Sequence, residues 1–228
     1  MVGIIKFFRD KDKLDQLVDG LFYCNTPEFY RLSDASGVSD HHESCANSFR
    51  KGRDSESIKL YINGFELPHI EKVTLHTNEH KDRWMHCWFA LTIPQTDIEL
   101  RALTDDINRM RDEFGCNYVF VEEKNIPILV GRLYTTTSLK IAHGLVKYSP
   151  NQFDWSAICK SDQYTYQREY RFLVGECSHS HVEPIKPKYD SGFSDLMYVN
   201  KKLELSSENQ CLFYMDPNGC YITPHQYG

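Results

Sequence analysis

Residues 163–172 form the segment richest in side chains that could do chemistry. The segment reads Gln-Tyr-Thr-Tyr-Gln-Arg-Glu-Tyr-Arg-Phe and leads into an apolar run. On a strand, alternate side chains point to the same face, so Gln167, Glu169 and Arg171 would lie in a row. An amide, a carboxylate and a guanidinium together can hold a polar ligand in a cleft. The alternative is an edge strand on which a Glu169–Arg171 ion pair faces water.

Two other places carry groups that could bind a ligand. Arg9 ends the first apolar segment just before an expected helix, where a guanidinium can bind phosphate through two hydrogen bonds. Residues 135–138 read Thr-Thr-Thr-Ser and are expected on, or at the end of, a strand. The simpler interpretations are a solvated surface arginine and the ordinary preference of β-branched residues for strands.

In chain order, these groups resemble the Arg, Ser-Thr-Ser, Gln-x-Glu motifs of one class of ADP-ribosyltransferases. Arg9 stands at the first motif, Gln167-x-Glu169 stands at the last, and a hydroxyl run stands between them. The run consists of Thr136, Thr137 and Ser138. It begins with Thr where the class has Ser, and no glycine-rich segment that would cradle NAD is evident. The resemblance implies a similar fold, with NAD as the substrate.

The resemblance also implies roles for the individual residues. Arg9 would hold the NAD phosphates, Arg171 would add a second cation, and the hydroxyl run would shape the nicotinamide pocket. Glu169 would stabilise the oxocarbenium ion as nicotinamide leaves. Gln167 would orient the acceptor, and Tyr30 or Tyr166 would stack on nicotinamide. The acceptor itself, a protein side chain, a nucleic acid or water, stays open.

The wider layout resembles an uncharacterised group of bacterial and phage proteins, over about residues 5–175. This group has an early short helix, then the motif Leu-Phe-Tyr-Cys-Asn-Thr-Pro-Glu-Phe-Tyr-Arg, an Asp-x-x-Glu loop and a late Lys–aromatic–Glu–Arg pattern. The matching residues after the first motif are Asp40, Glu43, Lys160, Tyr166, Glu169 and Arg171. This resemblance implies no established activity, although it is compatible with a defence or counter-defence effector. A hydrolytic site using Asp40, His41 and Glu43 as acid and base is a further alternative.

Several familiar kinds of site are absent from the sequence. It contains no G-x-G-x-x-G, Walker, H-E-x-x-H or G-x-S-x-G motif, which disfavours Rossmann, P-loop and α/β-hydrolase chemistry. The eight cysteines form no C-x-x-C pair, so free thiols are expected. Metal ligands would have to come from the histidines and cysteines at 41, 42, 45, 86 and 87. Surface histidines and core thiols are favoured there, and no metal is predicted.

Composition narrows the class of protein. The chain has 228 residues, a net charge of −6 and 41% hydrophobic residues. This acidic balance argues against non-specific nucleic-acid binding through overall charge. The apolar N-terminal run is too short for a signal peptide, and no stretch approaches a membrane span, so a cytoplasmic protein without a membrane partner is expected. A non-catalytic acidic protein that docks on a partner protein, as a binding or inhibitor protein, is the alternative to an enzyme.

The elements that must position these groups indicate an α+β fold, with strand-rich mixed or antiparallel sheets and few helices. Helices are expected after Asp10, over 97–114 and over 155–160. Strands are expected at 4–9, 21–25, 84–91, 117–121, 128–137, 145–148 and 170–174, and a hairpin at 58–70 around Asn63-Gly64. The whole chain is predicted to be one domain, with a polar loop or lid near 33–57.

Overall fold

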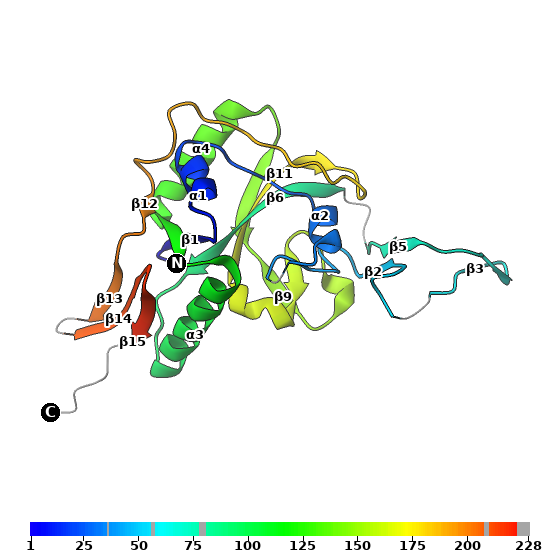
Figure 1. The fold of residues 1–228 in the computed structure, drawn as a ribbon, viewed down its shortest axis with the longest axis horizontal. Coiled ribbons are helices and arrows are strands. Elements are labelled where there is room, and N and C mark those ends of the chain that lie inside the picture. Colours follow the sequence, from blue (N-terminus) through cyan, green and yellow to red (C-terminus); the bar gives the residue numbers. More distant parts are fainter. Residues whose placement is uncertain (36, 56–57, 78–80, 208–209, 223–228) are drawn as a thin grey trace.

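An antiparallel sheet of six strands forms the centre of the computed structural model, which describes residues 1–35, 37–55, 58–77, 81–207 and 210–222 (Figure 1). In spatial order the strands are β12 (Tyr198–Val199), β7 (Asn117–Glu122), β1 (Gly3–Phe8), β6 (Asp82–Leu91), β11 (Glu169–Cys177) and β8 (Ile141–Leu145). The predicted α+β class, with mostly antiparallel sheets and few helices, is confirmed.

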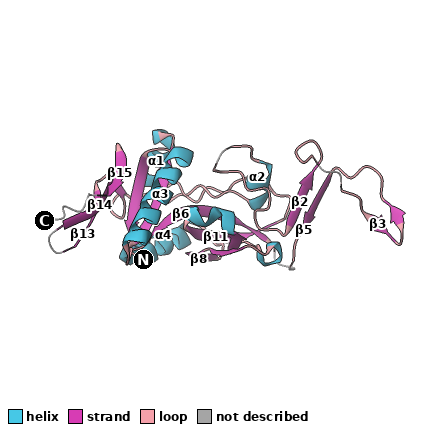
Figure 2. Cartoon of the chain, turned by 90° about the horizontal axis from the view of Figure 1, so that it is seen from below, coloured by secondary structure: helices cyan, strands magenta, loops and turns pink. Residues whose placement is uncertain are grey.

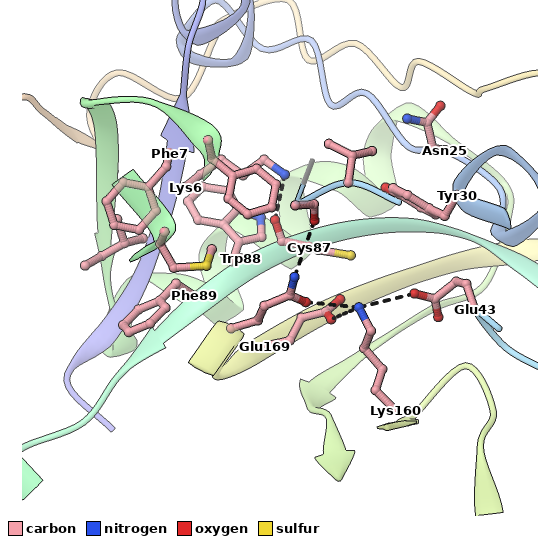
Figure 3. Close-up of a pocket in the computed structure, with 16 residues that line it drawn as sticks. Lys6, Phe7, Asn25, Tyr30, Glu43, Cys87, Trp88, Phe89, Lys160 and Glu169 are labelled. Atoms are coloured by element: carbon pink, nitrogen blue, oxygen red, sulfur yellow. Dashed lines mark hydrogen bonds and ion pairs between the residues drawn. The ribbon is translucent and has the colours of Figure 1, made fainter. Parts of the chain in front are cut away.

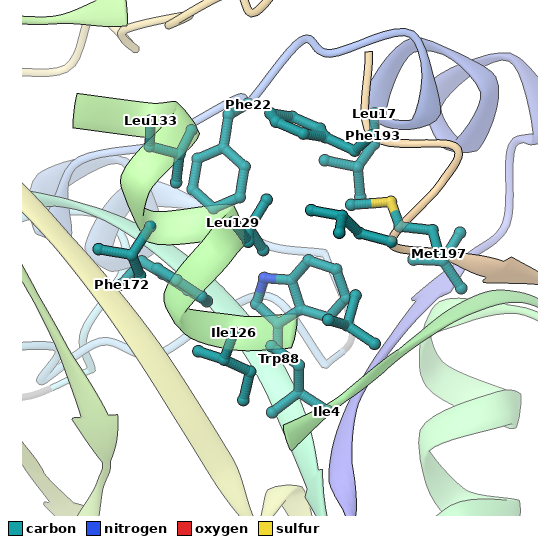
Figure 4. Packing of buried hydrophobic residues seen from close by; sticks show 14 of the residues in the cluster. Ile4, Leu17, Phe22, Trp88, Ile126, Leu129, Leu133, Phe172, Phe193 and Met197 are labelled. Atoms are coloured by element: carbon teal, nitrogen blue, oxygen red, sulfur yellow. The ribbon is translucent and has the colours of Figure 1, made fainter. Parts of the chain in front are cut away.

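One face of this sheet is covered by α1 (Lys11–Val18) and by α4 (Ile126–Thr136). The Asp10 side chain caps α1 by accepting from the backbone N–H of Asp12, as its position before the apolar spacing predicted. Figure 4 shows Leu17, Phe22 and Trp88 packed in this layer with residues from α4. The layer is mostly apolar, with His86 stacked on Phe22 as a buried polar member, and its apolar packing contributes stability.

The prediction of a strand at 128–137 is wrong, because these residues belong to the helix α4. Ile126, Leu129, Val130 and Leu133 recur at helical spacing and are all buried, and Pro127 lies in the first turn, where its missing N–H costs nothing. The β-branched threonines that suggested a strand lie at the exposed end of the helix. Tertiary burial of one helical stripe therefore decided the structure of this segment.

The other face carries α3 (Asp97–Phe114) and a small sheet at the C-terminal end of the described chain. That sheet contains β13 (Leu203–Ser207), β14 (Gln210–Asp216) and β15 (Gly219–Ile222). The predicted helix over 97–114 is confirmed, with Thr96 capping its start and Gly115 following at φ +102°. α3 and the small sheet lie toward one end of this face, and over β6 and β11 the face is covered by the segments around Glu43 and Lys160.

The two central strands β1 and β6 pair only over a short distance. Their register ends at the pair Ile5–Phe89, beyond which the strands separate. The Lys6 ammonium donates to the backbone carbonyl of Cys87 across the gap, at 2.6 Å. Asn25 pairs with Met85 farther along β6 through an isolated bridge, whereas a strand had been expected over 21–25. The gap between β1 and β6 leaves space for a cavity that residues of both strands line.

An arm extends from the far end of the sheet (Figure 2). It contains β2 (Asn47–Arg50) paired with β5 (Lys72–Leu75), and the hairpin of β3 (Tyr61–Ile62) and β4 (Phe65–Glu66). The predicted turn at Asn63-Gly64 is confirmed, with positive φ at both residues. The hairpin leaves large apolar side chains in solvent, and Phe65 is 78% exposed.

The polar segment 33–57 is more structured than the loop that was expected. It contains β2, and its residues Asp40 and Glu43 are buried. Residues 36 and 56–57 of this segment lie outside the described residues. Just before it lies the short helix α2 (Pro27–Leu32), capped by the Thr26 side chain, which had not been predicted. Buried charges as well as buried apolar residues, among them Cys45, Ala46 and Phe49, attach this segment to the rest of the molecule.

Short elements connect β8 to β11. They are β9 (Lys147–Ser149), η2 (Gln152–Asp154), β10 (Cys159–Ser161) and η3 (Asp162–Gln167), and β10 pairs parallel with β9. The helix expected over 155–160 is wrong, since Trp155 follows η2 and Cys159 and Lys160 lie on β10. In the described part of the chain, no helix has the length and apolar character needed to cross a membrane.

Candidate active site

A cavity of about 220 Å³ lies over the gap between β1 and β6 (Figure 3). Its apolar walls come from the sheet, from α3 and from the segment before Asp40. They consist of Ile5, Phe7, Val38, Trp88, Phe89, Met110 and Phe114. The polar groups of the lining are Lys6, Asn25, Tyr30, Glu43, Cys87, Lys160, Gln167 and Glu169. Among them, Glu43, Lys160 and Glu169 lie together as a charged part of the wall (Figure 3).

The charged part of the wall rests on a buried ion network centred on Arg171. Its guanidinium makes a two-pronged pair with Glu43, with Nη1–Oε1 at 2.9 Å and Nη2–Oε2 at 3.2 Å. Its Nε donates to Glu169 Oε1 at 2.7 Å. The three side chains are at most about 4% exposed, so water screens these charges little. The network links residues that are 128 positions apart in the sequence.

Lys160 is the second cation of this network and reaches it from β10. Its Nζ lies 3.4 Å from Glu169, 3.5 Å from Glu43 and 3.5 Å from Asp40. It also donates to Gln167 Oε1 at 3.0 Å. One ammonium thus lies among three carboxylates at the cavity wall. Figure 3 shows the Lys160 side chain directed at Glu43 and Glu169.

The charges and the burial of this network shift the pKa values of its members in different directions. Burial alone would raise the pKa of Glu169, but the charges of Arg171 and Lys160 outweigh it and hold that pKa well below its usual range. Burial, together with the charge of Glu43, raises the pKa of Asp40 to about 6 despite the nearby Lys160. Burial would lower the pKa of Lys160, yet the surrounding carboxylates raise it well above its usual value. Glu169 is therefore a fixed anion at neutral pH.

Strand register explains how the sequence positions these groups. On β11, Glu169 pairs with Phe89 and Arg171 pairs with Cys87 of β6, so both side chains face the cavity side of the sheet. Gln167 reaches the same side from η3, because Arg168 adopts a left-handed conformation at φ +39° between the two elements. The shared face predicted for Glu169 and Arg171 is thus present, but on a central strand and not on an edge.

Two acceptor atoms at this site have unused hydrogen-bonding capacity. Asn25 Oδ1 is buried and accepts no hydrogen bond from any described residue. Glu169 Oε2 likewise has no hydrogen bond of good geometry from the described chain, although the Lys160 ammonium lies 3.4 Å from it and the Cys87 thiol lies beside the carboxylate. Buried polar atoms in folded proteins nearly always have partners. A ligand with two donors, or bound water, would satisfy both atoms.

Lys6 contributes a further amine to the cavity. Burial lowers its pKa, and its hydrogen bond runs to the Cys87 carbonyl. Burial and the charge of Glu169 also raise the pKa of Cys87 to about 12, so its thiol is protonated at neutral pH. A lysine in the middle of the apolar run Ile-Ile-Lys-Phe-Phe was the sequence signal for this position, since lysine is rarely buried.

The structure brings together only some of the predicted site residues. Tyr30, Gln167 and Glu169 line the cavity. Arg171 lies behind Glu169 and positions it, rather than lining the cavity itself. Asp40 and Glu43, considered as acid and base of a hydrolytic site, belong to the same network, whereas His41 is outside the cavity lining.

Other predicted site residues lie elsewhere. Thr136 ends α4, where its hydroxyl donates to the Leu133 carbonyl, and Thr137 follows at the cap. They and Ser138 lie with α4 on the sheet face opposite Glu169, so the expected nicotinamide pocket is not built from them. The physical reason is the helix, which turns this segment onto the apolar layer.

Tyr166 and Arg9 lie beside the cavity, outside its lining. The Tyr166 ring packs against the Arg109 guanidinium, 3.3 Å from the ring centroid, and its hydroxyl donates to Glu113. Arg109 on α3 therefore covers one face of the Tyr166 ring, and that face is not available to stack on a ligand. Arg9 donates to the backbone carbonyl of Glu113, adjacent to the wall residue Phe114.

Of the candidate metal residues, Cys45 is a buried thiol as expected, whereas His86 is buried and not the surface histidine that was predicted. His86 is buried, stacks on Phe22 at 4.0 Å between ring centroids and hydrogen-bonds to the Tyr23 carbonyl. Each cysteine of the part described with its side chain is a free thiol. Cys45 and Cys87 are among them, and burial raises the pKa of both thiols to about 12.

Lys6 and Asn25 were not predicted as site residues, and Cys87 was considered only as a metal ligand, an interpretation that was not favoured. Lys160 had been noted only within the wider resemblance. The signal for Lys6 is a single charge inside an apolar run, whereas Asn25, Cys87 and Lys160, which Ser161 and Asp162 follow, carry no such local signal.

Comparison of the chain with protein-family models, with curated proteins and with solved structures finds no match. The basis for assigning a function is therefore the chemistry of the cavity.

Proposed function

We propose that the protein cleaves the nicotinamide–ribose bond of NAD in this cavity and transfers the ribosyl group to an acceptor. The observation that supports this most is the Glu169 carboxylate, held ionised by Arg171 and Lys160 against an apolar-walled space. Breaking a glycosidic bond develops positive charge on the sugar carbon. A fixed anion in a poorly solvated site stabilises that charge without having to reorganise.

The dimensions of the cavity agree with one end of the dinucleotide. Pockets for drug-sized ligands measure roughly 300–1,000 Å³, and this cavity is smaller, at about 220 Å³. Nicotinamide and its ribose would occupy it, with the pyridine ring on Phe89 and Phe114. The pyrophosphate would lie outside the cavity, near Arg9. The Arg9 guanidinium donates to the backbone carbonyl of Glu113, the residue before the wall residue Phe114.

The two unused acceptors match the donors of this ligand. The carboxamide N–H groups of nicotinamide would donate to Asn25 Oδ1, and a ribose hydroxyl would donate to Glu169 Oε2. Nicotinamide leaves with the electron pair of the broken bond. The acceptor hydroxyl or water, oriented by Gln167, then bonds to the same sugar carbon and releases its proton to solvent.

Glu169→Asp tests this proposal while keeping the buried charge. The shorter side chain keeps a carboxylate for Arg171 and Lys160 but moves it away from the cavity. We expect the rate of nicotinamide release from NAD to fall about 100-fold or more, the range lost when one such electrostatic group is removed. Release would be followed by chromatography of the free base with purified protein.

Glu176→Gln is the matched control, because Glu176 lies on the same strand and is exposed. It should retain the activity of the unaltered protein. Circular dichroism would show that both variants are folded. If the unaltered protein binds NAD without releasing nicotinamide, the non-catalytic binding protein is supported instead. If Glu169→Asp turns over NAD as fast as Glu176→Gln, Glu169 is not the catalytic carboxylate.

A further inference from the structure

A second cluster of polar side chains lies where the arm meets the sheet, apart from the cavity. His76 follows β5, Asp82 begins β6 and His179 follows β11. Each offers one donor atom, and these atoms lie within 4.8 Å of one another. The three residues come from three separate segments of the chain. Such a convergence of two imidazoles and a carboxylate matches the ligand chemistry of zinc.

His76 has the hydrogen-bonding pattern of a metal ligand. Its Nδ1 lies 3.2 Å from the backbone carbonyl of Ser44. A carbonyl only accepts, so Nδ1 carries the proton and Nε2 presents its lone pair. Nε2 is buried and has no hydrogen-bond partner among the described residues. Histidines that bind metals commonly donate their other ring N–H to a backbone carbonyl in this way.

His179 and Asp82 complete the donor set. His179 Nδ1 lies 3.3 Å from Asp82 Oδ2. Two ligands of a tetrahedral zinc ion are about 3.3 Å apart when the bonds measure about 2.0–2.1 Å. The His179 ring stacks on His76 with centroids 3.6 Å apart and an angle of 25° between the ring planes. The two imidazoles therefore lie side by side next to Asp82, and they would tilt apart to direct both nitrogens at one ion.

The neighbouring charges orient the carboxylate. Arg31 Nη2 donates to Asp82 Oδ2 at 2.9 Å, and Arg31 Nε donates to Glu28 at 2.8 Å. Arg31 therefore fixes the position of the buried Asp82 carboxylate, and a carboxylate retains further lone pairs after one such bond. Arg31 also donates to the His179 backbone carbonyl at 2.7 Å, which fixes that residue beside the cluster.

We propose that His76, Asp82 and His179 bind one zinc ion, with water as the fourth ligand. The ion would join the end of β5 to the sheet strands β6 and β11 and so fix the base of the arm. This site is independent of the cavity and of the reaction proposed there.

Zinc titration of the chelator-treated full chain tests the proposal by calorimetry. We expect one zinc per chain, and a loss of affinity greater than roughly 100-fold in His76→Ala and in His179→Ala, because even outer-shell changes cost 10–100-fold. His69→Asn is the control: His69 is an exposed histidine on the arm, and asparagine tolerates its positive φ of 60°. Equal zinc binding by the two alanine variants and the control would overturn the proposal.

Cobalt binding to the unaltered chain gives a readout that does not depend on how the variants fold. A tetrahedral site with two imidazoles and a carboxylate should produce the strong visible absorption of four-coordinate cobalt. Zinc should displace that cobalt. A weak, octahedral-type spectrum would contradict the proposed four-ligand site. Glu169→Asp should bind zinc like the unaltered chain, which separates this site from the cavity.

Discussion

Asp40 and Glu169 face the same ammonium group, yet their surroundings act on them in opposite directions. Glu169 has Arg171 as well as Lys160 beside it, and its pKa is held well below the usual range. Asp40 lies 3.5 Å from Lys160, is buried near Glu43, and its pKa is raised to about 6. Two carboxyl groups with separated pKa values are typical of sites that perform acid–base chemistry. Here the separation arises because the second cation contacts only one of them.

Asp40→Asn should change how stability depends on pH. Because the folded pKa of Asp40 is raised, the folded state binds more protons than the unfolded state between pH about 4 and about 6. The stability that Asp40 contributes is fully present below its unfolded pKa and is lost as the pH rises through about 6. The stability of Asp40→Asn relative to the unaltered protein should therefore increase over this range, by up to about 3 kcal/mol at 1.4 kcal/mol per pKa unit.

Urea unfolding at several pH values between 4 and 7 measures this difference. Asp34→Asn is the control, since Asp34 is an exposed aspartate of the same segment. A difference between Asp40→Asn and the unaltered protein that stays constant over this range would contradict the expected titration.

At the scale of elements, Gly115 and Gly131 differ in whether their position in the fold requires glycine. Gly115 ends α3 at φ +102°, and a Cβ there would lie 2.4 Å from the Phe8 carbonyl oxygen and 2.5 Å from Arg9 Cα. These are backbone atoms of the chain leaving β1, so they have little room to move. Gly131 lies within α4, and a Cβ there would meet nothing within 4 Å. One position requires glycine, whereas the other does not.

Gly115→Ala should destabilise the protein by about 2 kcal/mol or more, because it adds strain at a positive φ to a backbone clash. Gly131→Ala should stabilise it by about 0.5–1 kcal/mol through helix propensity and reduced freedom of the unfolded chain. Thermal unfolding of the two variants, compared with the unaltered protein, measures both effects. A loss of stability in Gly131→Ala would contradict α4 as a helix at this position.

At the scale of the whole molecule, buried ion pairs connect segments that are far apart in sequence. Arg31 on α2 is fully buried and contacts Glu28, Asp82 and the backbone carbonyls of Glu43 and His179. It thereby connects α2, the segment around Glu43 and two strands of the sheet. Arg171 makes a second such connection at the cavity. The cavity network depends on these attachments, because Glu43 belongs to both.

Arg31→Met should destabilise the protein by about 3–5 kcal/mol, since it leaves the buried carboxylate of Asp82 without its partner. Arg132→Met is the control, because the Arg132–Asp195 pair lies at the surface, with Asp195 60% exposed, and should cost at most about 1 kcal/mol. Chemical denaturation of both variants gives the comparison. Similar losses in the two variants would contradict a structural role for the buried network.

The sequence by itself determined the elements whose pattern is local. The caps and apolar spacing of α1 and α3, the apolar run of β6 and the Asn63-Gly64 turn each depend on residues a few positions apart. It also predicted that Glu169 shares one strand face with Arg171. Local patterns fail where burial overrides propensity, as in α4.

Only the tertiary structure decided which charges meet. Strand register places Arg171 beside Glu169, and the fold of residues 33–57 brings Glu43 to the same guanidinium from 128 positions away. The early separation of β1 from β6 opens the cavity, and α4 carries the hydroxyl run to the opposite face. The physical reason is that a buried ion pair or a cavity depends on distances between segments, which no periodicity within one segment encodes.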